Sequence, residues 1–497
     1  MTAVSGKPVV LTADRTLMAD HRTLFGGMIA ASQTTTTPRP LMDHLLAPRS
    51  RLSVAPLGLR RVEAALLCDG FSDGDVAVVE PERLAEVIGP ETRVIGVSAG
   101  EACGLGMNST TMTAIAGGEI YPRALVLELM REIGRLRERA PDARVVLGGP
   151  GAWQLVANDA LRVELGVDHV VHGPVEGNVA GLMHAMAAED DLPVLLEGGA
   201  VDAASIPAIR GASAMGAVEL SRGCGLGCTY CVMGREAMRH LPEETILADV
   251  RTNIAAGMRG IAAISEDLLR YGCTGSKPHP ERLIALLRQM REIPGAGLIQ
   301  TDHANIISVA AYSDAELAQV RELMVGETGC RHPWMNLGVE SACGQLLAQS
   351  GSAKLGGTAP AEWGEFAAEQ LRRLVRAGFM PMASLIMCLP GETPEHVRAT
   401  LEWVKGLSRE PLTIFPVLYA PIDGSSPPTR ADLTREHWRL IGACYDINFR
   451  EVPRMFRDGQ AAVGVPWARR MALQLLGYGQ VGLWSALFAW HGWRAAQ

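Results

Sequence analysis

At residues 221–231 the chain reads Ser-Arg-Gly-Cys-Gly-Leu-Gly-Cys-Thr-Tyr-Cys. Cys224, Cys228 and Cys231 therefore stand at C-x3-C-x2-C spacing, in a glycine-rich loop directly after a predicted strand. Thiolates are the usual ligands of iron–sulfur clusters, and glycines let the backbone fold tightly around such a group. Three cysteines leave one iron of a four-iron cluster without a cysteine ligand, so another molecule can coordinate that iron.

A structural zinc site is the alternative interpretation of the same cysteines. Zinc sites usually have a fourth Cys or His at a recognisable distance, and here only His240 follows Cys231 closely. The spacing therefore favours the iron–sulfur interpretation.

Strand-like runs alternate with helical patterns around and after the cysteine loop. The helical patterns include Pro280–Arg291 and Ala361–Ala377. Six such repeats predict a partial (β/α)6 barrel of the TIM type. The six predicted strands are Ala217–Ser221, Gly260–Ser265, Gly297–His303, Met335–Glu340, Met382–Leu389 and Thr413–Leu418.

Three motifs in this order resemble the radical S-adenosylmethionine (SAM) superfamily. Its signature is C-x3-C-x-aromatic-C, and Tyr230 occupies the aromatic place. Leu-Gly-Val-Glu-Ser at 337–341, which contains Glu340, is similar to the fourth-strand motif near the ribose of the cofactor. Met-Cys-Leu-Pro-Gly-Glu-Thr at 387–393 is similar to the ending of the fifth strand.

This resemblance implies a ligand set for the cysteine loop. Cys224, Cys228 and Cys231 would ligate a 4Fe–4S cluster. The amino and carboxylate groups of SAM would chelate the fourth iron.

The end of the second predicted barrel strand departs from the superfamily pattern. The superfamily often carries Gly-Gly-Glu there to grip the methionine amino group, whereas this chain reads Ser265-Glu266-Asp267. Three interpretations are open: Glu266 or Asp267 holds the ammonium group of SAM, Glu266 itself ligates the open iron, or the segment is a solvated acidic loop. Ligation by Glu266 would block ordinary reductive cleavage of SAM.

Strands and helices also alternate in the N-terminal part of the chain. They predict a doubly wound, Rossmann-like parallel sheet, which binds ligands at the carboxyl ends of its strands. The elements are strands at Val9–Leu11, Val94–Ser98, Arg144–Leu147 and Val170–Gly173, and an amphipathic helix at Leu125–Arg139.

A doubly wound domain before a radical SAM barrel resembles the cobalamin-binding subclass. The resemblance implies that loops at the strand ends surround the corrin ring and its nucleotide tail. The alternative is an ordinary nucleotide-binding or purely structural domain. The implied residues are Ser98, Gly100 with the rest of the loop 100–106, Gly148, Gly149, Pro150 and Gly173.

No histidine is expected on the lower face of the cobalt. The D-x-H-x-x-G motif that supplies one is absent, since Asp168-His169 lacks its spacing. Some radical methylases of this class place an arginine under the cobalt, and Arg60 or Arg61 is similarly available. The alternative is a surface or salt-bridged basic pair.

Composition excludes two other classes of protein. The chain has 497 residues, 48% of them hydrophobic, with a net charge of −8, so it is neither disordered nor built to coat nucleic acid. The start shows no secretory signal, so we expect a cytoplasmic protein whose clustered cysteines bind metal. The remaining cysteines stand singly and are expected to be mostly small core residues: Cys68, Cys103, Cys273, Cys330, Cys343, Cys388 and Cys444.

The segment from about residue 429 is predicted to be helical. Residues 471–493 carry no charge and are long enough to span a bilayer, but their polar residues and glycines favour a helical cap over membrane contact. Such a cap could close the barrel mouth. Five of the nine tryptophans lie in this segment: Trp438, Trp467, Trp484, Trp490 and Trp493.

These observations divide the chain into an N-terminal region with the cobalamin-binding domain (1–190), a linker (191–214), the radical SAM barrel (215–428) and a helical cap (429–497). The resemblance implies a methyltransferase that moves a methyl group from SAM via methylcobalamin to a carbon of a small molecule. It also implies a reducing partner such as flavodoxin or ferredoxin. The alternatives are an oxidative cyclase or ring-rearrangement enzyme, and a non-catalytic cluster or corrinoid carrier.

Polar residues near the predicted strand ends are candidates for contact with substrate, because active sites of parallel barrels lie there. Each is equally open to a structural role. They are Tyr271 after the second strand, Asp302, His303 and Asn305 after the third, and Tyr419 after the sixth.

Overall fold

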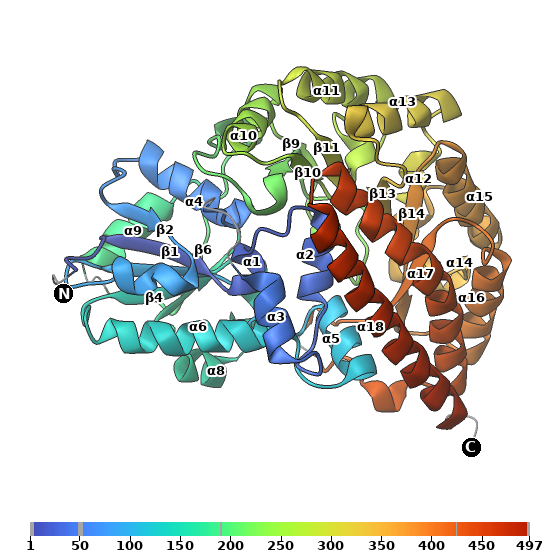
Figure 1. Ribbon diagram of the computed structural model, residues 1–497, viewed down its shortest axis with the longest axis horizontal. Coiled ribbons are helices and arrows are strands. Elements are labelled where there is room, and N and C mark those ends of the chain that lie inside the picture. The colour runs from blue at the N-terminus through green and yellow to red at the C-terminus, as the bar shows by residue number, and fades with distance from the viewer. Residues whose placement is uncertain (1–3, 48–52, 157, 189–190, 424, 495–497) are drawn as a thin grey trace. The chain divides into compact units, whose positions relative to one another are not determined.

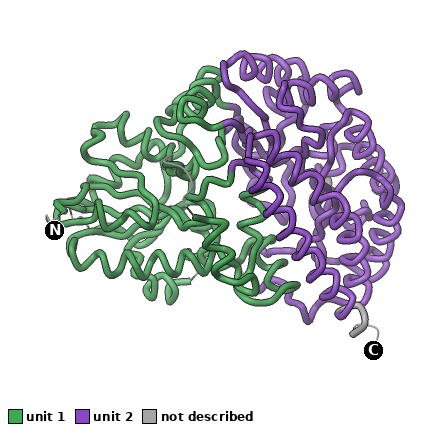
Figure 2. The backbone as a smooth tube through the Cα atoms, in the orientation of Figure 1, with its two compact units in different colours: residues 1–21, 26–218, 241–258 green, residues 22–25, 219–240, 259–497 purple. Residues whose placement is uncertain are grey.

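The computed structural model describes residues 4–47, 53–156, 158–188, 191–423 and 425–494. The chain divides into two compact units, shown in Figure 2. The first comprises residues 1–21, 26–218 and 241–258, and the second comprises residues 22–25, 219–240 and 259–497.

Parallel strands form the sheet of the first unit, in the order β2-β1-β3-β4-β5-β6. From β1 the chain passes to β2 on one side and then to β3 on the other, so the winding reverses between β1 and β3. The predicted doubly wound sheet is therefore confirmed, and open sheets of this kind bind ligands at such a reversal. The strands are β1 (Val9–Ala13), β2 (Val76–Val78), β3 (Val94–Ser98), β4 (Arg144–Gly148), β5 (His169–His172) and β6 (Leu195–Glu197).

Helices cover both faces of this sheet. Ile95 and Val97 of β3 share a buried cluster with α6 (Tyr121–Arg137). Val94 belongs to the opposite cluster, with α4 (Leu57–Cys68) and α9 (Val179–Ala187). Figure 1 shows α6 on one face and α4 and α9 on the other. Because successive strand residues point to opposite faces, strands buried on both sides appear in the sequence as continuous apolar runs.

The edge strand β6 lies inside the stretch 191–214, which the sequence predicts as a linker. Its residues Leu195 and Leu196 pair with Val170 and Val171 of β5. The strand has only three residues between glycine- and proline-rich segments, so composition alone does not reveal it.

The strands that begin at Ala217 and continue through the second unit form the predicted barrel. Their hydrogen-bonded order is β11-β10-β7 in one sheet and β12-β13-β14-β15 in the other. Only Asp302 separates β11 from β12, so these two segments make up the predicted third strand. The partial six-stranded barrel is therefore confirmed. Its strands are β7 (Ala217–Glu219), β10 (Gly260–Ile264), β11 (Leu298–Thr301), β12 (His303–Asn305), β13 (Trp334–Glu340), β14 (Met380–Met387) and β15 (Thr413–Leu418), and its longer helices are α11 (Pro280–Glu292), α13 (Asp314–Val325), α15 (Trp363–Arg376) and α16 (Pro394–Gly406).

The predicted helical tail is confirmed as α17 (Arg435–Ala462) and α18 (Trp467–Arg494). Helix α17 packs on β15 and α16, and α18 packs along α17 (Figure 1). Asn448 of α17 accepts a hydrogen bond from Ile414 N (2.8 Å) and donates one to Ile414 O (2.7 Å). The helix thus satisfies backbone groups of the last strand, which would otherwise be an open sheet edge.

Aromatic rings hold α18 against α17. Trp484 and Phe488 of α18 contact Tyr445 of α17, with ring centroids 5.5 and 4.7 Å apart. Trp438 and Trp484 are buried, whereas Trp467 and Trp490 are exposed. The side chain of Trp493 lies outside the described residues. None of the described helices is both long and apolar enough to cross a membrane.

We expect Trp484→Ala to release α18 locally. Removing a buried tryptophan lowers stability by about 3–5 kcal/mol. Because the ring packs between α17 and α18, this loss should weaken the contact between these two helices. Hydrogen exchange of the α18 amides should accelerate by roughly a hundredfold or more, while exchange in α6 stays unchanged. Leu483→Ala is the matched control, since Leu483 of the same helix is 70% exposed. Equal protection of α18 in the two variants would contradict this account.

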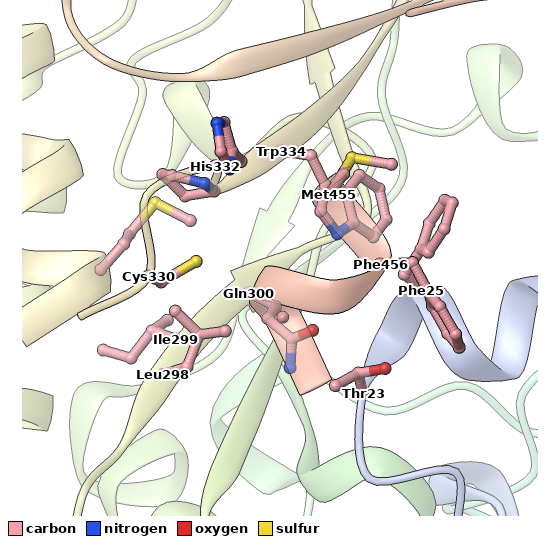
Figure 3. Close-up of a pocket in the computed structure, with 13 residues that line it drawn as sticks. Thr23, Phe25, Leu298, Ile299, Gln300, Cys330, His332, Trp334, Met455 and Phe456 are labelled. Atoms are coloured by element: carbon pink, nitrogen blue, oxygen red, sulfur yellow. The ribbon is translucent and has the colours of Figure 1, made fainter. Parts of the chain in front are cut away.

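The amino ends of the barrel strands enclose a small cavity (Figure 3). Thr23 and Phe25 from the N-terminal segment and Trp334 from β13 line it, with Met455 and Phe456 of α17. Its volume of about 10 Å³ has room for about one water molecule. This end of the barrel is therefore closely packed.

Candidate functional site

The three cysteines lie in a tightly folded loop between β8 (Ser221–Arg222) and β9 (Arg239–His240). Cys224 N donates to Met233 O (3.1 Å) and Glu236 O (3.0 Å). Gly223 has φ +76°, and a Cβ there would lie 2.6 Å from Ala237 O. Glycine is required at this position because both the backbone conformation and the close approach exclude a side chain.

Burial sets the state of the thiols. It raises the pKa of Cys224 and of Cys231, so both are protonated at neutral pH until a metal displaces the proton. Arg270, which is buried, donates to Cys224 O (2.9 Å), and Asn305 Nδ2 lies 3.9 Å from Cys224 Sγ. These contacts orient the loop from two neighbouring strand ends.

Tyr230, the aromatic residue of the motif, is 6% exposed. Its hydroxyl has no hydrogen-bond partner among the described residues, and burial together with Glu340 and Cys228 raises its pKa. An orphaned buried hydroxyl beside the cysteines fits a site that is completed by a bound polar molecule.

His240, the candidate fourth ligand of a zinc site, contacts side chains outside the cysteine motif. His240 Nε2 lies 3.5 Å from Cys273 Sγ, and its ring packs edge-on against Tyr271 at 5.4 Å. Tyr271 is buried in this contact, so the structure gives it a packing partner beside the cysteine loop.

The two carboxylates that follow β10, Glu266 and Asp267, lie in different environments. Asp267 is fully buried and accepts from Asn305 N (3.0 Å) and Ser308 Oγ (2.6 Å). Both of its oxygens are therefore used to fix the start of α12 (Ile306–Val309). Glu266 is half-buried with no such bond, and burial together with Asp302 raises its pKa, against a lowering by His303. Glu266 is thus the carboxylate of this pair that is available to a ligand.

The predicted substrate-side residues after β10 and β11 come together. Asp302 Oδ1 accepts from His303 N (2.9 Å) and Ser265 N (3.4 Å), and Asp302 Oδ2 lies 3.4 Å from His303 Nδ1. Partial desolvation lowers the pKa of His303, but the nearby carboxylates of Asp302, Glu266 and Glu340 raise it overall. The ring is accessible, so His303 offers an exposed and readily protonated group. Tyr419 is half-buried at the end of β15, and its N donates to Met387 O of β14 (3.0 Å).

A buried ion pair completes this end of the barrel. Lys354 Nζ lies 3.0 Å from Glu340 Oε1 and donates to Asn305 Oδ1 (3.0 Å). A Cβ at Gly338 would overlap the Glu340 carboxylate and lie 2.7 Å from Lys354 Nζ, which explains the glycine in the Leu-Gly-Val-Glu-Ser motif. Lys354 was missed in the sequence, because it follows β13 by more than ten residues and stands in no motif.

A second cluster with ligand-type atoms follows β14. The ligand atoms of Cys388, Glu392 and His437 lie within 4.8 Å of one another. However, Thr434 N donates to His437 Nδ1 (3.1 Å), so the proton is on Nε2, which faces Glu392 Oε2 at 2.9 Å. A metal would need the Nε2 lone pair. The cluster is therefore a hydrogen-bonded brace between the β14 loop and α17.

In the first unit, the predicted glycines gather at the carboxyl edge of the sheet. Gly149 has φ +91°, and a Cβ there would lie 2.6 Å from Ser98 Oγ. Gly151 N donates to Ala99 O (2.8 Å). These loops pack closely on each other. Of the remaining predicted residues of this edge, Gly148 ends β4, and Gly100, Pro150 and Gly173 follow β3, β4 and β5.

The two predicted arginines of α4 are both engaged inside the first unit. Arg60 donates to Ala212 O (3.0 Å) and pairs with Glu63 at 2.9 Å. Arg61 pairs with the fully buried Asp249. These contacts favour the salt-bridged interpretation of the pair over a place beneath cobalt.

Asp14 is a feature of this edge that sequence reasoning missed. It follows β1 at the reversal of the sheet and caps α1 (Arg15–Met18), accepting from Thr16 N (2.8 Å) and Thr16 Oγ1. Its Oδ2 is buried without a partner among the described residues, and burial raises its pKa to about 6.

We expect Asp14 to make the stability of the chain depend on pH. Because the pKa is raised in the folded state, the contribution of Asp14 is fully present below about pH 4 and is lost as the pH rises through about 6. The shift corresponds to about 3 kcal/mol. Between pH 4 and 7, Asp14→Asn should therefore gain about that much unfolding free energy relative to the unmodified chain, measured by urea denaturation. A constant difference across this range would contradict the assignment.

The structure does not support the expectation that the single cysteines are mostly core residues. Of the seven, only Cys330 and Cys444 are buried. The others lie at element ends or in loops, where packing is incomplete: Cys68, Cys103, Cys273, Cys343 and Cys388.

Comparison with known proteins gives the fold a precedent. No protein-family model matches the chain. It is 25% identical over 275 residues to the ribosomal protein uS12 methylthiotransferase RimO of Geobacter sulfurreducens, covering 52% of this chain and 56% of that protein. The chain thus spans about half the length of this relative.

Two solved structures are similar over most of the chain. Both are the radical S-adenosylmethionine methyltransferase TsrM from Kitasatospora setae. One, with tryptophan substrate and a SAM analogue, has a TM-score of 0.55 at 17% identity, over 84% of this chain and 75% of that chain. The other, with cobalamin and a [4Fe-4S] cluster, has a TM-score of 0.53 at 16% identity, over 84% and 74%. The predicted architecture, a doubly wound domain followed by a partial barrel and a helical C-terminal region, is therefore confirmed as a fold.

Proposed function

We propose that this chain is a cobalamin-dependent radical SAM methyltransferase that moves a methyl group from SAM to a carbon of a small molecule. The observation that carries the proposal is the loop of Cys224, Cys228 and Cys231 at the carboxyl end of the barrel. It lies with the available carboxylate of Glu266 and the orphaned hydroxyl of Tyr230.

The residues present fit a 4Fe–4S cluster. Three thiols from one glycine-rich loop are the donor set that such a cluster takes. Glu266 is the residue to which we assign either the ammonium group of SAM or the fourth iron. Asp267 is assigned a positioning role, since its oxygens already hold Asn305 and Ser308.

The edge between β1 and β3 fits cobalamin, which when bound would accept and donate the methyl group. Ser98 and the glycine loops after β3 and β4 would lie against the macrocycle. The engaged guanidinium groups of Arg60 and Arg61 support a lower face without an arginine ligand.

Residues of the chain itself would orient the substrate. His303, held by Asp302 and with its pKa raised by the neighbouring carboxylates, would donate a hydrogen bond to an acceptor on the substrate. The buried Lys354–Glu340 pair would keep Asn305 in place and exclude water from this side of the loop. Tyr419 and Tyr271 would contribute shape rather than proton transfer. A small iron–sulfur or flavin protein would supply the electrons.

Product analysis with labelled methyl donor tests the proposal. The chain, reconstituted anaerobically with iron, sulfide and cobalamin, is given reductant, methyl-labelled SAM and tryptophan as the first candidate substrate. We expect S-adenosylhomocysteine together with label in the product. A cyclised or rearranged product without label would contradict methyl transfer and support the oxidative cyclase or ring-rearrangement alternative. Formation of neither S-adenosylhomocysteine nor 5′-deoxyadenosine would contradict catalysis altogether.

A further inference from the structure

A groove between α17 and α18 forms a second candidate binding site in the second unit. Its volume is about 430 Å³, within the range of small-molecule sites. None of its residues belongs to the cysteine site. The lining residues are Arg435, Trp438, Arg439, Gly442, Asp446 and Phe449 of α17, and Ser485, Phe488 and Ala489 of α18.

Two unpaired cations stand at one end of the groove. Arg435 and Arg439 lie one helical turn apart and form no ion pair within the described part of the chain. Like charges at this spacing repel each other, and the N-terminus of a helix disfavours cations. Arg435 is the first residue of α17, so both effects act here. A bound anion would relieve both.

Aromatic faces form the body of the groove. Trp438 is 9% exposed, and the guanidinium of Arg430 lies 6.0 Å from the centroid of its ring. Phe449 and Phe488 are half-buried with their rings stacked 6.1 Å apart. Such walls suit a flat apolar group that follows the anionic end of a ligand.

Asp446 limits the charge that the groove accepts. It follows Arg439 by seven residues, about 10 Å along the helix axis, and forms no ion pair among the described residues. A polyanion laid along the groove would meet this carboxylate. The distribution of charge therefore favours a single anionic group at the arginine end.

We infer that this groove binds a small aromatic carboxylate, with the carboxylate on Arg435 and Arg439 and the ring against Trp438, Phe449 and Phe488. The inference does not depend on the proposed methyl transfer. The groove nevertheless adjoins the barrel, because His437, next to Trp438, braces the loop after β14 through Glu392 at 2.9 Å. A ligand in the groove would thus press on an element that leads into the carboxyl end of the barrel.

Calorimetric titration of the reconstituted full chain tests the site, with indole-3-acetate as probe and indole-3-acetamide as its neutral isostere. We expect the acetate to bind at least about tenfold more tightly, as charge-assisted hydrogen bonds to arginine require. Replacing both arginines (Arg435→Gln with Arg439→Gln) should remove this preference and leave the affinity for the amide unchanged. Arg457→Gln, at an exposed arginine of the same helix outside the groove, should change neither affinity.

Three results would overturn the inference. Binding of the acetate that survives the double substitution would place the probe elsewhere. An equal loss in the Arg457→Gln control would indicate nonspecific attraction by charge. Absence of acetate binding at millimolar concentration would show that the groove takes no such ligand.

Discussion

Cys228→Ala is expected to abolish assembly of the iron–sulfur cluster and every activity that depends on it. Gly234 and Gly351 close on the backbone of Cys228, where a Cβ on either glycine would come within 3.0 Å of it. This packing leaves no room for another donor to replace the lost thiolate. Reconstituted protein should fall from about four irons per chain to fewer than one, with loss of the visible thiolate-to-iron absorption.

Cys343→Ser is the matched control for this substitution. Cys343 is, like Cys228, a cysteine of the second unit, but it is half-buried and its Sγ lies 3.4 Å from Gln345 Oε1, outside the cysteine loop. It should retain the full iron complement and the absorption. If Cys228→Ala still binds four irons, the cluster has other ligands and the assignment is wrong. If the unmodified chain binds zinc in place of iron, the zinc interpretation is correct.

The strands that form buried parallel sheets could be predicted from the sequence. Val94–Ser98 and Thr413–Leu418 have the predicted bounds in the structure, because a strand covered on both faces is a continuous apolar run between turn signals. β6 could not be predicted, since an edge strand of three residues buries too little to leave a pattern. For that reason the predicted linker, residues 191–214, includes β6.

The cysteine loop could also be predicted, because its three cysteines are close together in the sequence. The residues that contact and support this loop could not be predicted from the sequence. Asn305 and Arg270 lie at the ends of two different strands, Lys354 follows a helix after a third strand, and the three meet only in the folded barrel. Sequence spacing also could not distinguish Glu266 from its neighbour Asp267; that difference arises from burial and hydrogen bonding in the folded chain.

Lys354→Met should destabilise the second unit by about 3–5 kcal/mol, because it leaves the Glu340 carboxylate buried without a counter-charge. The two side chains are 7% and 10% exposed and 3.0 Å apart. Hydrogen exchange of the β13 and β14 amides should report the loss. Lys405→Met is the matched control: its pair with Glu402 is 2.7 Å long but 47% and 69% exposed, so the effect should stay below about 1 kcal/mol.

A double-mutant cycle separates the structural part of this effect from any chemical role of Lys354. Glu340→Gln alone leaves the ammonium buried with Asn305 as its remaining acceptor among the described residues, and should also be destabilising. Lys354→Met combined with Glu340→Gln removes both charges and should regain most of the lost stability, with a coupling energy of at least about 1 kcal/mol. If the double variant is stable but binds SAM no better than Lys354→Met, the Lys354 ammonium contributes to SAM binding in addition to stability. Additive losses would show that the two side chains act independently and that the pair does not hold this end of the barrel.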